Sequence, residues 1–79
     1  PRPLTHDIAC EIITKLGGTL VSVRIKDLRD NIFYADIEIE TPRGLVTVDS
    51  RPSDAMALAA KTGAKIYVED HVIAAAQVD

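Results

Sequence analysis

Apolar residues recur at helical spacing near the start of the chain. Between Thr5 and Leu16 they form one stripe, made of Ile8, Ala9, Ile12, Ile13 and Leu16. Thr5 is suited to cap the helix, because its hydroxyl can accept a backbone N–H, and Asp7 adds a favourable negative charge in the first turn. Gly17 and Gly18 predict the end of this helix.

The period then changes to alternation, the pattern of a strand with one buried face. Two runs, residues 19–28 and 32–41, have this pattern, and a shorter run follows at residues 45–49. The residues expected on the buried face are Val21, Val23, Ile25, Phe33, Ala35, Ile37, Ile39, Val46 and Val48. Asn31 and the pair Pro42 and Gly44 favour short turns between the runs. The pattern predicts an antiparallel three-strand meander.

The opposite face of this meander carries charges of both signs. Arg24 and Lys26 lie on it from the first strand, and Asp36, Glu38 and Glu40 from the second. We interpret them as cross-strand ion pairs, each of about 0.2–1 kcal/mol, rather than as a binding surface.

A second helix is predicted after Pro52, because proline is accepted in the first turn of a helix. Its buried face should hold Ala55, Leu58, Ala59 and Thr62, and Gly63 should end it. A brief strand at residues 64–68 and a last helical segment at residues 71–78 follow.

The expected fold class is therefore α+β, with the order helix, three strands, helix, strand, helix. Because a helix separates the last strand from the third, we expect that strand to join the sheet by a parallel crossover. We expect a single domain covering residues 1–79. The chain begins at Pro1 rather than at methionine, so we expect that an N-terminal part of the natural domain precedes it.

Composition narrows the classes of partner. The net charge of −3 argues against a broad basic surface that coats nucleic acid, although it is compatible with a nuclease whose acidic site holds a metal ion. Cys10 is the only cysteine, which excludes an internal disulfide and fits a reducing compartment, so we expect a cytoplasmic protein. No apolar run approaches the roughly 18 residues of a membrane span, and no membrane contact is expected.

The densest group of polar side chains lies where the third strand meets the second helix. Asp49 and Asp54 could hold Mg²⁺ or Mn²⁺, which prefer oxygen ligands, and Arg51 could contact a phosphate. The alternative is structural: Asp54 assists the helix start, Asp49 accepts from local amides, and Arg51 pairs with one of them. Spacing alone favours this alternative.

His6 is the second candidate, as a general base or metal ligand. On an ideal helix His6 lies at the border of the apolar stripe, whereas Asp7 points nearly opposite to that stripe. The two therefore do not share one face, which weakens an interpretation of them as a dyad. A histidine bonded to nearby backbone is the more ordinary expectation.

Several motifs together resemble the bifunctional nuclease (BFN) domain family, which includes bacterial and plant proteins. The resemblance covers essentially the whole chain, and its most specific part is Asp-x-Arg-Pro-Ser-Asp-Ala at residues 49–55. The other matching segments are Arg2-Pro3-Leu4-Thr5-His6-Asp7, Asp27-Leu28-Arg29-Asp30, Phe33-Tyr34-Ala35, Gly63-Ala64 and Ile66-Tyr67-Val68.

The resemblance implies a hydrolase with both RNase and DNase activity, and therefore a nucleic-acid partner. The positions that it singles out are Thr5, His6, Asp7, Asp49, Arg51, Ser53 and Asp54. The resemblance also implies that family domains contain an N-terminal segment with its own strands before these motifs, and we expect that this segment is missing here. A sheet edge left unpaired by that loss favours association with another copy, so we expect a homo-oligomer.

Two functions follow from these observations. In the first, a nuclease hydrolyses phosphodiester bonds, with Asp49, Asp54 and His6 catalytic, Arg51 and Ser53 binding substrate, and Asp49 and Asp54 holding Mg²⁺ or Mn²⁺. In the second, the chain is a non-catalytic homo-oligomeric module in which the same motif fixes a corner of the fold.

Overall fold

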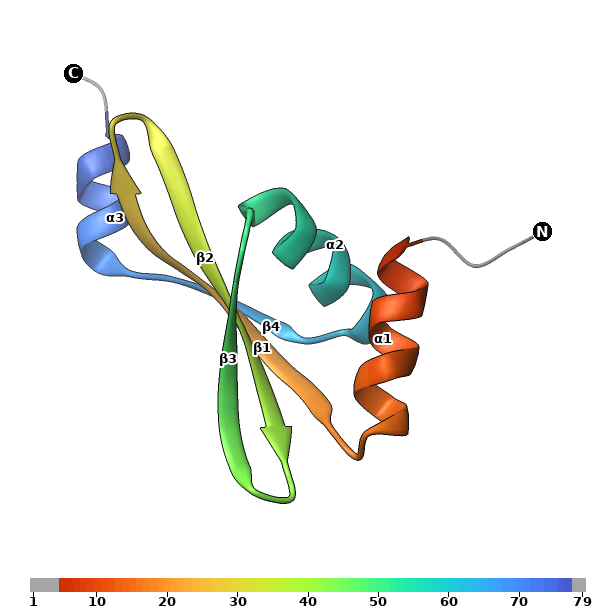
Figure 1. The fold of residues 1–79 in the computed structure, drawn as a ribbon. Helices are drawn as coiled ribbons and strands as arrows, with labels where there is room; N and C mark the ends of the chain where they lie inside the picture. The colour runs from red at the N-terminus through yellow and green to blue at the C-terminus, as the bar shows by residue number, and fades with distance from the viewer. Residues whose placement is uncertain (1–4, 78–79) are drawn as a thin grey trace.

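The elements follow the expected order in the computed structural model, which describes residues 5–77 (Figure 1). Their bounds are α1 (Thr5–Lys15), β1 (Thr19–Arg29), β2 (Ile32–Thr41), β3 (Gly44–Ser50), α2 (Pro52–Thr62), β4 (Lys65–Val68) and α3 (Asp70–Ala76). The prediction of an α+β fold is confirmed. Among the helices of this part of the chain, none is long and apolar enough to cross a membrane.

The strands form one mixed sheet in the order β3-β2-β1-β4. The antiparallel meander is confirmed, since β2 pairs antiparallel with both β1 and β3. β4 lies on the far side of β1 and runs parallel to it, so the predicted parallel crossover through α2 is also confirmed. The turn between β1 and β2 has positive φ at Asp30 (51°) and Asn31 (63°), as a type I′ hairpin requires.

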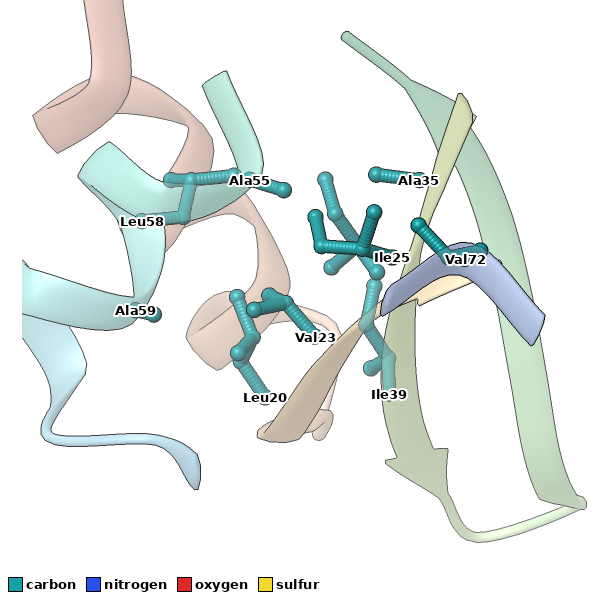
Figure 2. Packing of buried hydrophobic residues seen from close by; sticks show 10 residues of the cluster. Leu20, Val23, Ile25, Ala35, Ile39, Ala55, Leu58, Ala59 and Val72 are labelled. Carbon is teal, nitrogen blue, oxygen red and sulfur yellow. The ribbon is translucent and has the colours of Figure 1, made fainter. Parts of the chain in front are cut away.

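The core lies between one face of the sheet and the helices (Figure 2). Six buried side chains come from β1 and β2, three from α2 and one from α3: Leu20, Val23, Ile25, Ala35, Ile37, Ile39, Ala55, Leu58, Ala59 and Val72. Ala55 and Ala59 have small side chains, which let α2 approach the sheet closely. Residues 70–76 are anchored by Val72, the one buried side chain of α3.

The expected inward position of Val21 is wrong, because Leu20 occupies it. The register between β1 and β2 shifts between Leu20 and Ser22, which marks a β-bulge. A bulge adds one residue to one strand and so changes which side chains face the core. Leu20 consequently opposes Ile39, and Val23 opposes Ile37.

Burial is only partial at the edges of the predicted core. Phe33, Val46 and Val48 remain 42%, 45% and 47% exposed. For Val46 and Val48 the reason is that no helix packs extensively on β3. Thr62 is exposed rather than buried, and its hydroxyl donates to the carbonyl of Leu58 at 2.9 Å. The last helix ends at Ala76, and the expected end at Val78 lies outside the described residues.

The polar face of the sheet makes the expected cross-strand ion pairs. Lys26 lies 2.6 Å from Asp36, and Arg24 lies 3.7 Å from Glu38. Arg24 also contacts Glu69 at 3.1 Å and stacks over the ring of Tyr67. This face is therefore internally neutralised rather than a basic surface.

Candidate functional site

The candidate site forms where β3 ends and α2 begins. Arg51 has extended backbone (φ −71°, ψ 145°), and Pro52 follows as the first helical residue. The backbone amides of Asp54 and Ala55 both donate to the carbonyl of Arg51 at 3.1 Å. Proline has a preset φ and no amide hydrogen to leave unpaired, so the Arg-Pro step gives a sharp entry to the helix. Asp54 is thereby fixed in the first turn of α2.

Asp54 joins a histidine and an arginine. Its Oδ1 lies 3.0 Å from His6 Nε2, and its Oδ2 lies 3.0 Å from Arg51 Nε. The side chains of His6 and Asp54 are about one-third exposed (33% and 34%), whereas that of Arg51 is 79% exposed. The expectation that His6 bonds to nearby backbone is therefore wrong, because its partner is a carboxylate 48 residues away.

These contacts fix the charge state of the carboxylate. The hydrogen bond from His6, followed by that from Arg51, lowers the pKa of Asp54 below its ordinary value of 3.8. Asp54 is then an anion at neutral pH, and it accepts a hydrogen bond from His6 Nε2. The tautomer with a proton on Nε2 leaves Nδ1 as the basic nitrogen of a neutral His6 ring.

A second ion pair joins the same two helices. Lys61 Nζ in α2 lies 2.7 Å from Asp7 Oδ1 in α1. Among the described residues of α1 none is buried, so these polar contacts contribute to the placement of this helix against α2. His6 and Asp7 thus contact two different residues of the same neighbouring helix, Asp54 and Lys61.

Asp49 lies away from this cluster. It opposes Asp36 in the register of β2 and β3, and its Oδ1 is 3.2 Å from Lys26 Nζ. The contacts with Asp36 and then Asp49 raise the pKa of Lys26 above 10.5. Asp49 therefore belongs to the polar face of the sheet, whereas Asp54 belongs to a helix that packs on the apolar face.

The remaining candidates are peripheral. Ser53 is exposed in the first turn of α2, and Thr5 is exposed at the start of α1. Sequence reasoning missed Lys26 and Lys61 as partners of the candidate aspartates, since ion pairs between distant segments leave no local pattern. An open apolar groove of about 440 Å³ between α2, α3 and β4 includes Pro52 in its lining, but not the three residues of the cluster.

Binding of a divalent cation at this corner would need several carboxylates or other ligands close together. Within residues 5–77, no group of three or more His, Cys, Asp and Glu side chains is placed to hold a metal ion. Both oxygens of Asp54 already accept from His6 and Arg51, and Asp49 lies with Lys26. The side chains of one chain therefore do not form a ready site for Mg²⁺ or Mn²⁺ at this corner.

Comparison with known proteins places the chain in a family. Two proteins from different strains of Mycobacterium tuberculosis, both named as uncharacterized, are 46% identical to it over 76 residues. The match covers 96% of this chain but only 44% of each relative, so the chain spans less than half of their length. The sequence profile of the bifunctional nuclease domain matches residues 1–79. The chain therefore belongs to the bifunctional nuclease domain family.

Proposed function

We propose that this domain hydrolyses phosphodiester bonds of RNA and DNA at the His6–Asp54–Arg51 cluster. The observation that carries the proposal is the bridging carboxylate of Asp54, which contacts both an imidazole and an exposed guanidinium in a member of a family named for nuclease activity. A base and a cation, two groups that assist attack on a phosphodiester, therefore contact the same carboxylate.

His6 serves as the general base in this proposal. Asp54 orients the ring and holds the proton on Nε2, which leaves Nδ1 to take a proton from water as that water attacks phosphorus. The P–O bond to the leaving nucleotide oxygen breaks in the same reaction, and that oxygen takes a proton from solvent. Asp54 also stabilises the imidazolium that forms. A positioned acid or base of this kind typically contributes about 10²–10⁴-fold to a rate.

Arg51 serves as the phosphate contact. Its Nε is held by Asp54, while its largely exposed side chain keeps the terminal nitrogens available to a phosphate oxygen. Ser53 lies in the same first helical turn, where its hydroxyl can donate to the substrate. The proposed mechanism includes no metal step, because Asp49 lies on the polar face of the sheet with Lys26, whereas Asp54 lies in α2 with His6.

The alternative is a non-catalytic homo-oligomeric module. The observation that favours it is that each oxygen of Asp54 makes a contact with a structural role, one to α1 and one at the start of α2. The cluster would then hold the two helices together, and the function would lie in self-association or in a partner.

The two functions differ in the effect of Asp54→Asn on cleavage of labelled single-stranded RNA and DNA. We expect the variant to lose about 10²–10⁴-fold in rate while it remains folded by circular dichroism. Asp70→Asn is the matched control, because Asp70 occupies the first turn of α3 as Asp54 does that of α2. Unchanged cleavage in Asp54→Asn, or equal traces in every variant, would leave only the structural role.

Asp49→Asn distinguishes a metal site shared by Asp49 and Asp54 from catalysis by the His6–Asp54–Arg51 cluster. Each variant is assayed with Mg²⁺, with Mn²⁺ and with EDTA. We expect Asp49→Asn to keep its activity, since Asp49 contacts Lys26 on the polar face. Joint loss in Asp49→Asn and Asp54→Asn, together with loss in EDTA, would instead support two carboxylates that share a metal ion.

A further inference from the structure

Helix α1 and the residue that follows it, Leu16, expose a row of large apolar side chains. Ile8, Ile12 and Leu16 follow one another at intervals of four residues and are 45%, 53% and 78% exposed. The other apolar residues of this helix, Ala9, Cys10 and Ile13, already pack against the core. A row at i, i+4 and i+8 is the ridge that one helix presents to another. We call these three residues the α1 ridge.

The ridge borders an apolar groove over the uncovered half of the sheet. Two adjoining hollows of about 270 and 160 Å³ share Ile13 and Ile39. Their further lining includes Ile12 from α1 and Val46 and Val48 from β3, both about half exposed. Packing against the ridge therefore also covers one wall of this groove.

Two opposite charges flank the ridge. Glu11 and Lys15 lie beside Ile8, Ile12 and Leu16 in the same shallow surface hollow. Within residues 5–77 neither forms an ion pair, although they are four positions apart on one helix. Both lie on the same side of the ridge, away from the face that packs against the core.

We propose that two copies of this chain associate by packing their α1 helices antiparallel about a two-fold axis near Ile12. Equivalent flanks of two antiparallel helices lie on the same side of their interface, so Glu11 of one copy faces Lys15 of the other. The ridge then meets its own counterpart, Ile8 against Leu16 and Ile12 against Ile12. A parallel arrangement would place the charged flanks on opposite sides and leave them unpaired.

The charges beside the ridge support a second copy as the occupant. Glu11 and Lys15 are opposite charges four positions apart on one helix. An antiparallel second copy therefore presents a lysine to Glu11 and a glutamate to Lys15.

The edge of the sheet formed by β4 is the other surface that could mediate self-association. β4 is four residues long and begins at Lys65, and short strands with lysine are features that protect an edge from pairing. It also lacks a pair of complementary charges like that of α1. The inference rests on the self-association in the alternative function above and not on catalysis, so the two can fail separately.

The first experiment measures the mass of the protein by light scattering across a concentration series. We expect a dimer, and at least a tenfold weaker association for Ile12→Lys. Ile66→Lys is the matched control, since Ile66 on β4 is 46% exposed against 53% for Ile12. Circular dichroism confirms that both variants fold. A monomeric wild type, or a dimer lost in Ile66→Lys and kept in Ile12→Lys, would overturn the proposal.

The second experiment tests the antiparallel pairing by charge exchange. Glu11→Lys alone and Lys15→Glu alone each place like charges across the interface, and we expect roughly tenfold weaker association for each. An equimolar mixture of the two variants restores both attractions, so it should form a mixed dimer with near wild-type affinity. Failure of the mixture to associate, while wild type does so, would overturn the antiparallel geometry. Cleavage activity is measured separately on the same samples.

Discussion

Substituting Val72 tests how α3 is held on the domain. Val72 is 1% exposed and is the one buried side chain in the seven residues of this helix. An isolated helix of that length is not stable in water, so its docking depends on tertiary packing. Val72→Ala removes two buried methyl groups, and the core around Ile25 and Ala35 loses those contacts (Figure 2).

The size of the effect follows from transfer and cavity terms. Two buried methyl groups are worth about 1.6 kcal/mol of transfer free energy, and the cavity adds up to about 1 kcal/mol. The higher helix propensity of alanine returns about 0.5 kcal/mol. We therefore expect a loss of about 1–2 kcal/mol from a total near 4–12 kcal/mol, and a Tm lower by about 4–16 °C.

Urea unfolding and calorimetry of Val72→Ala and Ile73→Ala provide the measurement. Ile73 is the neighbouring residue but is 48% exposed, so its truncation should cost less than about 1 kcal/mol even though it removes more atoms. Equal losses in the two variants, or a larger loss in Ile73→Ala, would refute the assignment of α3 docking to Val72.

The remaining predictions concern backbone, pH and metal ions. Gly63→Ala should cost about 1 kcal/mol by urea unfolding, because Gly63 ends α2 at φ 72° although no atom would meet the new Cβ within 4 Å. Gly18→Ala should also destabilise, for a steric reason, because its Cβ would lie 3.1 Å from methyl groups of Ile13 and Ile39. The stability difference between wild type and Asp54→Asn should be present near neutral pH and shrink as the pH falls below 3.8. The pKa of Asp54 is lowered in the folded state, so its contribution to stability is lost only when the folded-state carboxylate becomes protonated. Millimolar Mg²⁺ or Mn²⁺ should leave the Tm within about 1 °C if no metal site is preformed, and a large rise would show that the ligands assemble.

Most of the fold was predictable because its signals are local. Alternation from Thr19 to Asp49 and the glycines that end two helices gave the order of elements and the meander. The bulge at Leu20 was not predictable, since one added residue in a strand leaves no mark in an apolar run and depends on pairing with β2. The exposure of Val46 and Val48 also depends on which part of the sheet the helices cover.

The candidate site was predictable in its residues but not in its contacts. The link between His6 and Asp54 joins segments 48 positions apart, and it depends on how α1 packs against α2. The position of Asp49 did have a signal: if Val46 and Val48 face the core, alternation places Asp49 on the opposite face. Applied to this corner, that rule predicts the separation of Asp49 from the helix that carries Asp54.

The most direct test of the proposed active site is chemical rescue of a His6→Gly variant. Cleavage of labelled RNA and DNA is measured for this variant with and without added imidazole, beside Asp54→Asn under the same conditions. If His6 is the base, cleavage falls in His6→Gly and imidazole restores part of it in a concentration-dependent way, while Asp54→Asn gains nothing. Wild-type cleavage in His6→Gly, or a loss that imidazole leaves unchanged in a folded variant, would contradict the role given to this histidine.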